Sequence, residues 1–141
     1  MPKVTAERIF NLPIDDLWEV LGDFGDTGKW SGRPKEACVQ EGQGIGSLRT
    51  LTIADGRVIV DRLEAETDYS YTYSVVSGPL PYESYKATMA VKSVDETNTL
   101  FTWTGEFEMT DMSDEEGIKF TESVYASGIK MMEHTLERLK A

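Results

Sequence analysis

The spacing of apolar residues along the chain changes twice, and each change predicts a different kind of element. Residues 3–12 alternate loosely between apolar and polar, which is typical of a strand. Residues 14–24 then carry apolar side chains at helical spacing, with Ile14, Leu17, Trp18 and Leu21 on one face. Glycines at positions 22, 25 and 28 interrupt this helix, so a second short helix or turn is expected around Trp30.

From about residue 35 to residue 110, alternation with a period of two predicts about six strands. The alternation is clearest over residues 49–53, 69–75 and 99–109. β-branched and aromatic residues dominate these runs, as they do in strands. Turn-forming residues separate the runs near positions 42–44, 54–56, 77–81 and 95–98. Consecutive strands joined by tight turns predict an antiparallel sheet.

Helical spacing returns between Ser113 and Ala141. Ser113, followed three residues later by Glu116, has the pattern of a capping box at a helix start. One apolar stripe is formed by Phe120, Val124, Met131 and Thr135, and it is widened by Ile129, Met132, Leu136 and Leu139. A helix of about 25 residues is about 38 Å long, enough to cross a small sheet. The order of elements predicts an α+β domain with helices on one face of the sheet.

Length, charge and composition narrow the function classes. The 141 residues predict one domain spanning 1–141. A net charge of −11 makes nucleic acid and anionic membrane surfaces poor partners, because both need lysine and arginine. No apolar run reaches about 18 residues and the N-terminus has no signal-peptide pattern, so a cytoplasmic protein without a membrane span is expected. With one cysteine, Cys38, and one histidine, His134, no disulfide, metal site or cofactor is expected.

Aromatic side chains concentrate on one face of the predicted sheet: Tyr71, Tyr73, Tyr85, Phe101, Trp103 and Phe107. These residues could simply fill the core. However, a core of this size rarely contains several tyrosines, because each buried hydroxyl needs a partner. A tyrosine-rich face suits a cavity that is apolar but locally polar, and the six methionines add adaptable apolar surface. Core and cavity both remain possible from the pattern alone.

The placement of Arg49 and Asp61 depends on the turn between them. A two-residue turn at Asp55 and Gly56 would pair Arg49 near Arg62 and put Asp61 on the other face. A three-residue loop, with Gly56 in the left-handed region, would put Arg49 opposite Asp61. A slip of one residue moves every side chain to the other face of the sheet. In the second register the pair would be inward-facing and costly unless water or a ligand satisfied it, whereas a solvated outer pair is the alternative.

Several segments together resemble the START-like, birch-pollen-allergen-like (SRPBCC) superfamily, whose members are often labelled polyketide cyclase/dehydrase. The resemblance covers nearly the whole chain and rests on residues 13–18, 22–30, 46–51, 60–63 and 78–85, on Trp103 with Phe107, and on the last helix. It implies a helix-grip fold, in which a curved seven-stranded antiparallel sheet surrounds a long C-terminal helix, with two short helices after the first strand. It also implies a cavity for a small hydrophobic or amphipathic molecule between sheet and helix.

Plant abscisic acid receptors are distant relatives in this superfamily, and they imply a site. Their cavity arginine and glutamate match Arg49 and Asp61, which favours the second register, and their ligand-contacting tyrosine matches Tyr85. The receptor lysine that holds the ligand's carboxylate falls near Glu36, so abscisic acid is a poor ligand here. The ligand contacts expected on this basis are Arg49, Leu51, Ile59, Asp61, Tyr71, Tyr73, Tyr85, Ala87, Trp103, Phe107, Val124, Ser127 and Met131.

Three functions remain open from the sequence. The first is binding or carriage of a small hydrophobic molecule by a monomer or weak dimer. The second is a metal-free cyclase, dehydratase or lyase, with Asp61 as the base and Arg49 or a tyrosine hydroxyl polarising a carbonyl. A paired aspartate is expected to have a lowered pKa, which argues against its use as a base. The third is a protein-interaction module whose acidic surface would favour a basic partner.

Overall fold

A single antiparallel sheet and one long helix account for most of the chain. The structure, a computed structural model, describes residues 1–140. The elements in chain order are β1 (Lys3–Phe10), α1 (Ile14–Leu21), α2 (Gly28–Ser31), the 3₁₀ turn η1 (Lys35–Ala37), β2 (Cys38–Glu41), β3 (Leu48–Thr52), β4 (Val58–Thr67), β5 (Ser70–Ser77), β6 (Tyr82–Asp95), β7 (Asn98–Met109) and α3 (Asp114–Lys140).

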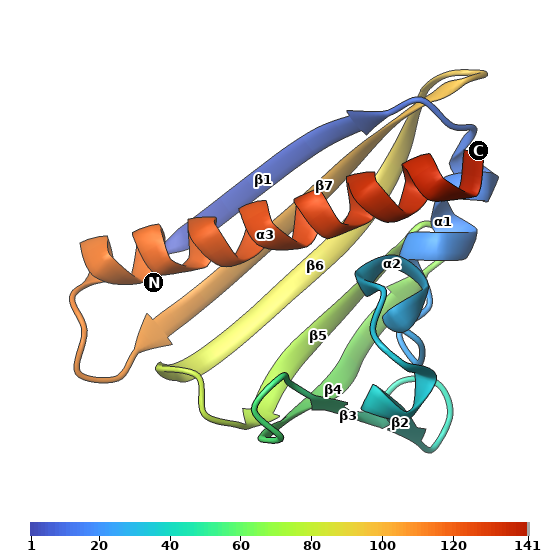
Figure 1. Cartoon of the computed structure of the whole chain (residues 1–141). Helices are drawn as coiled ribbons and strands as arrows, with labels where there is room; N and C mark the ends of the chain where they lie inside the picture. Colours follow the sequence, from blue (N-terminus) through green and yellow to red (C-terminus); the bar gives the residue numbers. More distant parts are fainter. Residues whose placement is uncertain (141) are drawn as a thin grey trace.

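The seven strands form one sheet in the order β1-β7-β6-β5-β4-β3-β2, and every neighbouring pair is antiparallel. Only β1 lies out of sequence order, because it pairs with β7 at one edge. The short helices α1 and α2 follow β1, and α3 runs diagonally across the sheet (Figure 1). The predicted α+β helix-grip fold, with six strands after the short helices, is confirmed.

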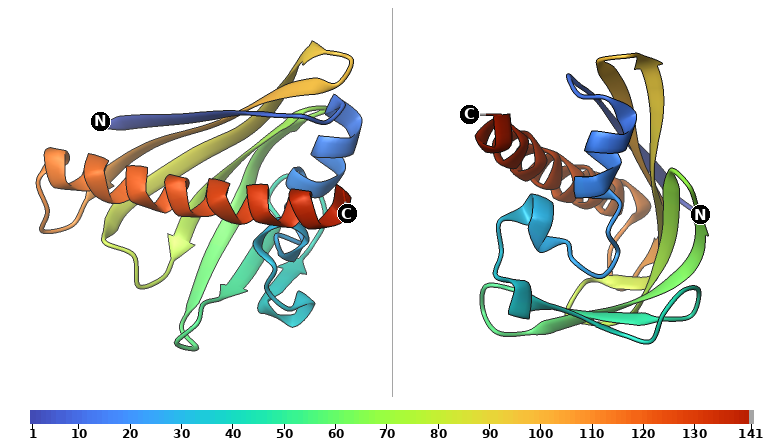
Figure 2. Two further views of the ribbon diagram at one scale, coloured as in Figure 1. Left: turned by 45° about the horizontal axis from the view of Figure 1, so that its top comes forward. Right: turned by 90° about the vertical axis from the view of Figure 1, so that its right-hand side faces the viewer.

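The sheet is strongly curved, and its concave face turns toward the helices (Figure 2). The strand pairing is irregular at two places in β4, between Val60 and Asp61 and between Leu63 and Ala65. Similar shifts occur near both ends of β6. Bulges of this kind bend a strand and increase its twist. The irregularities in β4 and β6 therefore contribute to the curvature of the sheet.

The turn between β3 and β4 settles the register that the sequence left open. Ile53 donates its N–H to the carbonyl of Arg57 (2.9 Å), which closes a three-residue loop. Gly56 in this loop has φ +90°, the left-handed region that favours glycine. Arg49 therefore pairs with Asp61 and Leu51 with Ile59, so these four side chains share the concave face.

Helix α3 begins as predicted, but its buried face lies slightly to one side of the predicted stripe. The Ser113 hydroxyl accepts the N–H of Glu116 at the helix start, as in a capping box. The buried residues are Gly117, Thr121, Tyr125, Gly128, Ile129, Met132 and Leu136, whereas Val124 and Met131 are more than a third exposed. Neither α3 nor any other helix within residues 1–140 is long and apolar enough to cross a membrane.

Candidate functional site

A cavity of about 390 Å³ lies between the concave face of the sheet and α3. Its floor is formed by strands β3 to β7, and its walls by α3 and by residues 27–38. Half-exposed or exposed residues, including Leu80, Val124 and Met131, surround its opening. Most of the lining side chains are apolar or aromatic. The size and composition are those of a pocket for a small organic molecule.

Most residues that the sequence analysis assigned to a ligand site do line this cavity: Arg49, Leu51, Ile59, Asp61, Tyr73, Tyr85, Trp103, Val124, Ser127 and Met131. Three of the predicted contacts do not line it. Phe107 is fully buried and packs edge-on against Tyr82. Ala87 is buried between β5 and β7. Tyr71 lies behind Arg49, with its ring against Phe24.

Several lining residues are not among the ligand contacts predicted from the sequence. They include Trp30, Cys38, Leu80, Tyr82 and Met89. Trp30 comes from α2, and its carbonyl accepts a hydrogen bond from Thr135 of α3 (2.8 Å), which fixes this wall to the helix. Tyr125 does not line the cavity, but its hydroxyl joins the polar groups that do. Its spacing of four from Thr121 and Ile129 was the signal that it belongs to the buried face of α3.

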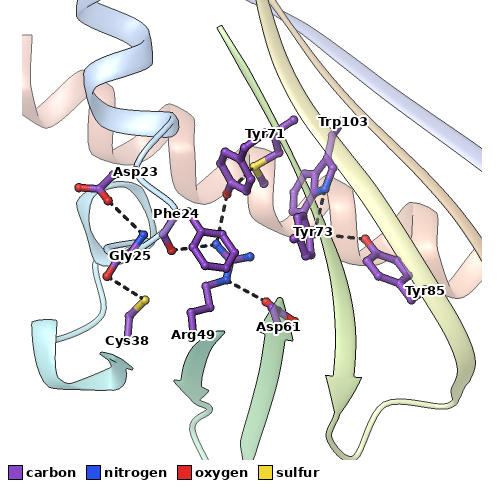
Figure 3. A network of polar contacts seen from close by, with 11 residues as sticks. Asp23, Phe24, Gly25, Cys38, Arg49, Asp61, Tyr71, Tyr73, Tyr85 and Trp103 are labelled. Atoms are coloured by element: carbon purple, nitrogen blue, oxygen red, sulfur yellow. Dashed lines mark hydrogen bonds and ion pairs between the residues drawn. The ribbon is translucent and has the colours of Figure 1, made fainter. Parts of the chain in front are cut away.

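The guanidinium of Arg49 is buried among aromatic rings on the floor of the cavity (Figure 3). Its Nε donates to Oδ2 of Asp61 (2.9 Å), and Nη1 donates to the Phe24 carbonyl (3.1 Å) and to the Tyr71 hydroxyl (3.3 Å). The guanidinium carbon also lies 4.4 Å from the Phe24 ring centre and 4.8 Å from that of Tyr73. These contacts replace the water that a buried cation loses.

The carboxylate of Asp61 is only half satisfied. The residue is 2% exposed, and its Oδ1 has no hydrogen-bond partner within the described chain. Burial raises the pKa of Asp61 above its usual value, although the charge and hydrogen bond of Arg49 oppose this. The expectation of a lowered pKa is therefore wrong, because one hydrogen-bonded oxygen does not compensate for the loss of water around both.

A row of phenol hydroxyls continues from the ion pair across the floor of the cavity (Figure 3). The indole N–H of Trp103 donates to the Tyr73 hydroxyl (3.2 Å), which lies 3.3 Å from the Tyr85 hydroxyl. The Tyr85 hydroxyl in turn lies 2.5 Å from that of Tyr125. Burial raises the pKa of Tyr73 and Tyr85 well above the ordinary value, so both hydroxyls stay protonated at neutral pH.

Within residues 1–140, no group of three histidine, cysteine, aspartate or glutamate side chains lies close enough to hold a metal ion. The Cys38 thiol donates to the carbonyl of Gly25 (3.4 Å), so it has a structural partner. The polar side chains that line the cavity are the Arg49–Asp61 ion pair, the Arg33 guanidinium, indole N–H groups and hydroxyls. Such groups can orient a polar end of an apolar molecule, and Asp61 can also exchange a proton.

Comparison with known proteins identifies a family whose sequence model matches the whole chain. The family model described as polyketide cyclase / dehydrase and lipid transport matches residues 1–141. No curated protein matches the chain in sequence.

Solved structures share the fold over almost the whole chain. The protein XoxI from Bacillus cereus is 27% identical, with a TM-score of 0.85 over 100% of this chain and 99% of that one. An uncharacterised protein from Bacillus thuringiensis is 28% identical, with a TM-score of 0.82 over 94% of this chain and 96% of that one. A START superfamily protein from Mycobacterium smegmatis, 11% identical, has a TM-score of 0.82 over 99% of each chain, which shows the fold alone.

Removing one partner of the buried ion pair should destabilise the protein far more than replacing both partners with apolar residues. Arg49→Met would leave the Asp61 carboxylate buried without its cation, and we expect a loss of about 3–5 kcal/mol in the free energy of unfolding at neutral pH. The double variant Arg49→Met/Asp61→Leu should recover most of this loss, since no charge is then buried. Urea denaturation measures both effects. The exposed Arg57, paired with Asp55, offers a control: Arg57→Met should change stability little. Equal losses of stability in Arg49→Met and Arg57→Met would contradict the conclusion that Arg49 compensates a buried charge.

The raised pKa of Asp61 makes its contribution to stability depend on pH. The native state holds the Asp61 proton more tightly than the unfolded state does, so this contribution is greatest at low pH. It is lost as the pH rises from about 3.9, the ordinary value, through the raised native pKa. We expect the stability difference between wild type and Asp61→Asn, measured by urea denaturation, to fall with rising pH.

Asp55 provides a control for this pH dependence, because its pKa is shifted in the opposite direction. Hydrogen bonds from Arg57, led by its backbone N–H, lower the pKa of Asp55. Its contribution is therefore present above the ordinary aspartate pKa and is lost as the pH falls, so the difference between wild type and Asp55→Asn should grow with pH. A difference for Asp61→Asn that also grows with pH, or stays constant, would contradict the raised pKa.

Proposed function

We propose that this chain, which belongs to the polyketide cyclase / dehydrase and lipid transport family, binds a small and largely apolar molecule in the cavity between the sheet and α3. The observation that carries the proposal is the cavity itself: about 390 Å³, mostly apolar, with a buried ion pair and two tyrosine hydroxyls on its floor. This combination suits an amphipathic ligand whose polar end meets the floor.

Two unpartnered polar atoms on lining residues support a ligand with polar groups. Oδ1 of Asp61 and Nε1 of Trp30 are both buried without a hydrogen-bond partner in the described chain. An unpaired buried polar atom costs about 1–3 kcal/mol. A ligand that reached either atom after a small side-chain rotation would remove part of this cost. The proposal thus gives these two atoms a role that packing alone does not.

The family description supports the same function at a coarser level, because it joins lipid transport with cyclase and dehydrase chemistry. Both activities require that an apolar molecule be enclosed. The mouth of the cavity also suits entry from solvent: Val124, Ser127 and Met131 of α3 are all exposed and also line the cavity. A wholly buried cavity would lack such residues.

Blocking the mouth should prevent binding without harming the fold. The fluorescent ketone 6-propionyl-2-(dimethylamino)naphthalene, which emits at shorter wavelength in apolar surroundings, should bind wild type and raise its melting temperature. Ser127→Trp would fill the mouth, and we expect the dissociation constant to rise about tenfold, or ~1.4 kcal/mol. Ala126 is exposed on the same helix but outside the lining, so Ala126→Trp should bind the probe like wild type. Equal affinities of the two variants would place the ligand elsewhere.

A second candidate function, an enzyme that removes a proton next to a carbonyl, is favoured by the state of Asp61. A carboxylate with a raised pKa and a free Oδ1 is a stronger base than a fully paired one. Arg49 and the tyrosine hydroxyls lie on the same floor and could stabilise the developing enolate. Cyclisation and dehydration of polyketide-like substrates both need such a step.

Hydrogen–deuterium exchange tests this chemistry without knowledge of the natural substrate. The methyl group beside the carbonyl of 2-acetylnaphthalene should exchange faster in D₂O with wild-type protein than in buffer, as followed by NMR. Asp61→Asn should return the rate to that of buffer, because the base is lost. Asp55→Asn, at an exposed position outside the lining, should exchange like wild type. Exchange that persists in Asp61→Asn would exclude Asp61 as the base.

A further inference from the structure

We propose that the cavity selects ligands with a carbonyl or similar acceptor oxygen. This oxygen would accept a hydrogen bond from the hydroxyl of Tyr73 or Tyr85, because the row of tyrosine hydroxyls has one more hydrogen than the contacts within the row use. This inference rests on the proposed function, because it concerns the ligand of the same cavity. It adds which chemical group the ligand must present and which side chains receive it.

The surplus follows from counting hydrogens. Three phenol groups, those of Tyr73, Tyr85 and Tyr125, bring three hydroxyl hydrogens. The two contacts between them, at 3.3 and 2.5 Å, each use one hydrogen. The fourth member, Trp103, donates to Tyr73 and cannot accept, because an indole has only a donor. Whichever way the row is oriented, one hydroxyl hydrogen has no acceptor within it.

The position of that hydrogen is limited by burial. Tyr125 is fully buried, does not line the cavity, and has no hydrogen-bond partner besides Tyr85 within residues 1–140. A hydrogen left there would be buried without an acceptor, which is unfavourable. Tyr73 and Tyr85 line the cavity, so a hydrogen pointing outward from either one can meet a ligand. The favourable orientations therefore have Tyr125 donating to Tyr85.

The row is suited to be a donor rather than an acceptor toward the ligand. The Tyr73 oxygen already accepts the N–H of Trp103, and linked hydrogen bonds polarise one another, which strengthens the outward donor. Trp103 is itself held by the Tyr125 ring stacked on it at 4.2 Å. Burial also keeps both cavity hydroxyls protonated, so the donor persists across the physiological range. A neutral acceptor oxygen, such as that of a ketone, fits this site.

A pair of probes with the same shape isolates this hydrogen bond. 2-Acetylnaphthalene has a C=O group where 2-isopropenylnaphthalene has C=CH₂. The dissociation constants of both are measured by equilibrium dialysis for wild type and for Tyr73→Phe/Tyr85→Phe. The dissociation constant of the ketone divided by that of the hydrocarbon should be about five- to tenfold higher in the double variant than in wild type, because only the ketone loses a hydrogen bond. Tyr69→Phe, at an exposed tyrosine bonded to Asp15 outside the cavity, should leave the ratio unchanged.

The infrared stretch of the bound ketone gives a second measurement that needs no variant. In wild type the carbonyl frequency should lie below its value in cyclohexane, because the oxygen accepts a hydrogen bond. A frequency equal to that in cyclohexane, or a probe ratio that the double variant leaves unchanged, would overturn this inference while leaving the proposed function intact. Failure of wild type to bind either probe would contradict the proposed function and this inference with it.

Discussion

The ion pair between Arg49 and Asp61 is the interaction on which the rest of the cavity depends. Burying two charges is costly, and the protein offsets that cost with a carbonyl, a hydroxyl and three aromatic rings around one guanidinium. The same contacts hold the segment after α1, through Phe24, against strands β3 and β5. The segment that leads into residues 27–38, one wall of the cavity, is thereby held against the floor. A hydrophobic pair could fill the space, but it would not present a charge there.

Asp61 and the tyrosine hydroxyls are incompletely satisfied for the same reason. The concave face brings these polar side chains together where little water reaches them. Oδ1 of Asp61 has no hydrogen-bond partner in the described chain, and we infer that the row of tyrosine hydroxyls has one hydrogen without an acceptor in the row. Incomplete pairing of this kind is unfavourable for stability and favourable for recognition. The two proposed functions are therefore compatible in this cavity: both would enclose an apolar molecule, and only proton transfer would need Asp61 as a base.

Much of the fold could be predicted because its signals are local. The alternation in β5 and β7 follows from the two-residue period of a strand, and the cap of Ser113 on α3 joins residues three apart in the chain. The site was harder to predict. Tyr71 belongs to the same strand face as Tyr73, yet it does not line the cavity, because Arg49 and the ring of Phe24 pack against it. The pKa of Asp61 was expected to fall and instead rises, since desolvation depends on all surrounding groups.

The sequence by itself determined the order of the elements, the antiparallel sheet and the residue types that could carry chemistry. It also limited the turn at Gly56 to two geometries, but both satisfy the local preferences of the chain. Only the tertiary structure decided between them, because the choice depends on whether Arg49 and Asp61 find Phe24, Tyr71 and Tyr73 on the concave face. Those partners lie far away in the sequence, so no local pattern records them. The same is true of Tyr125, which reaches Tyr85 only after α3 has packed across the sheet.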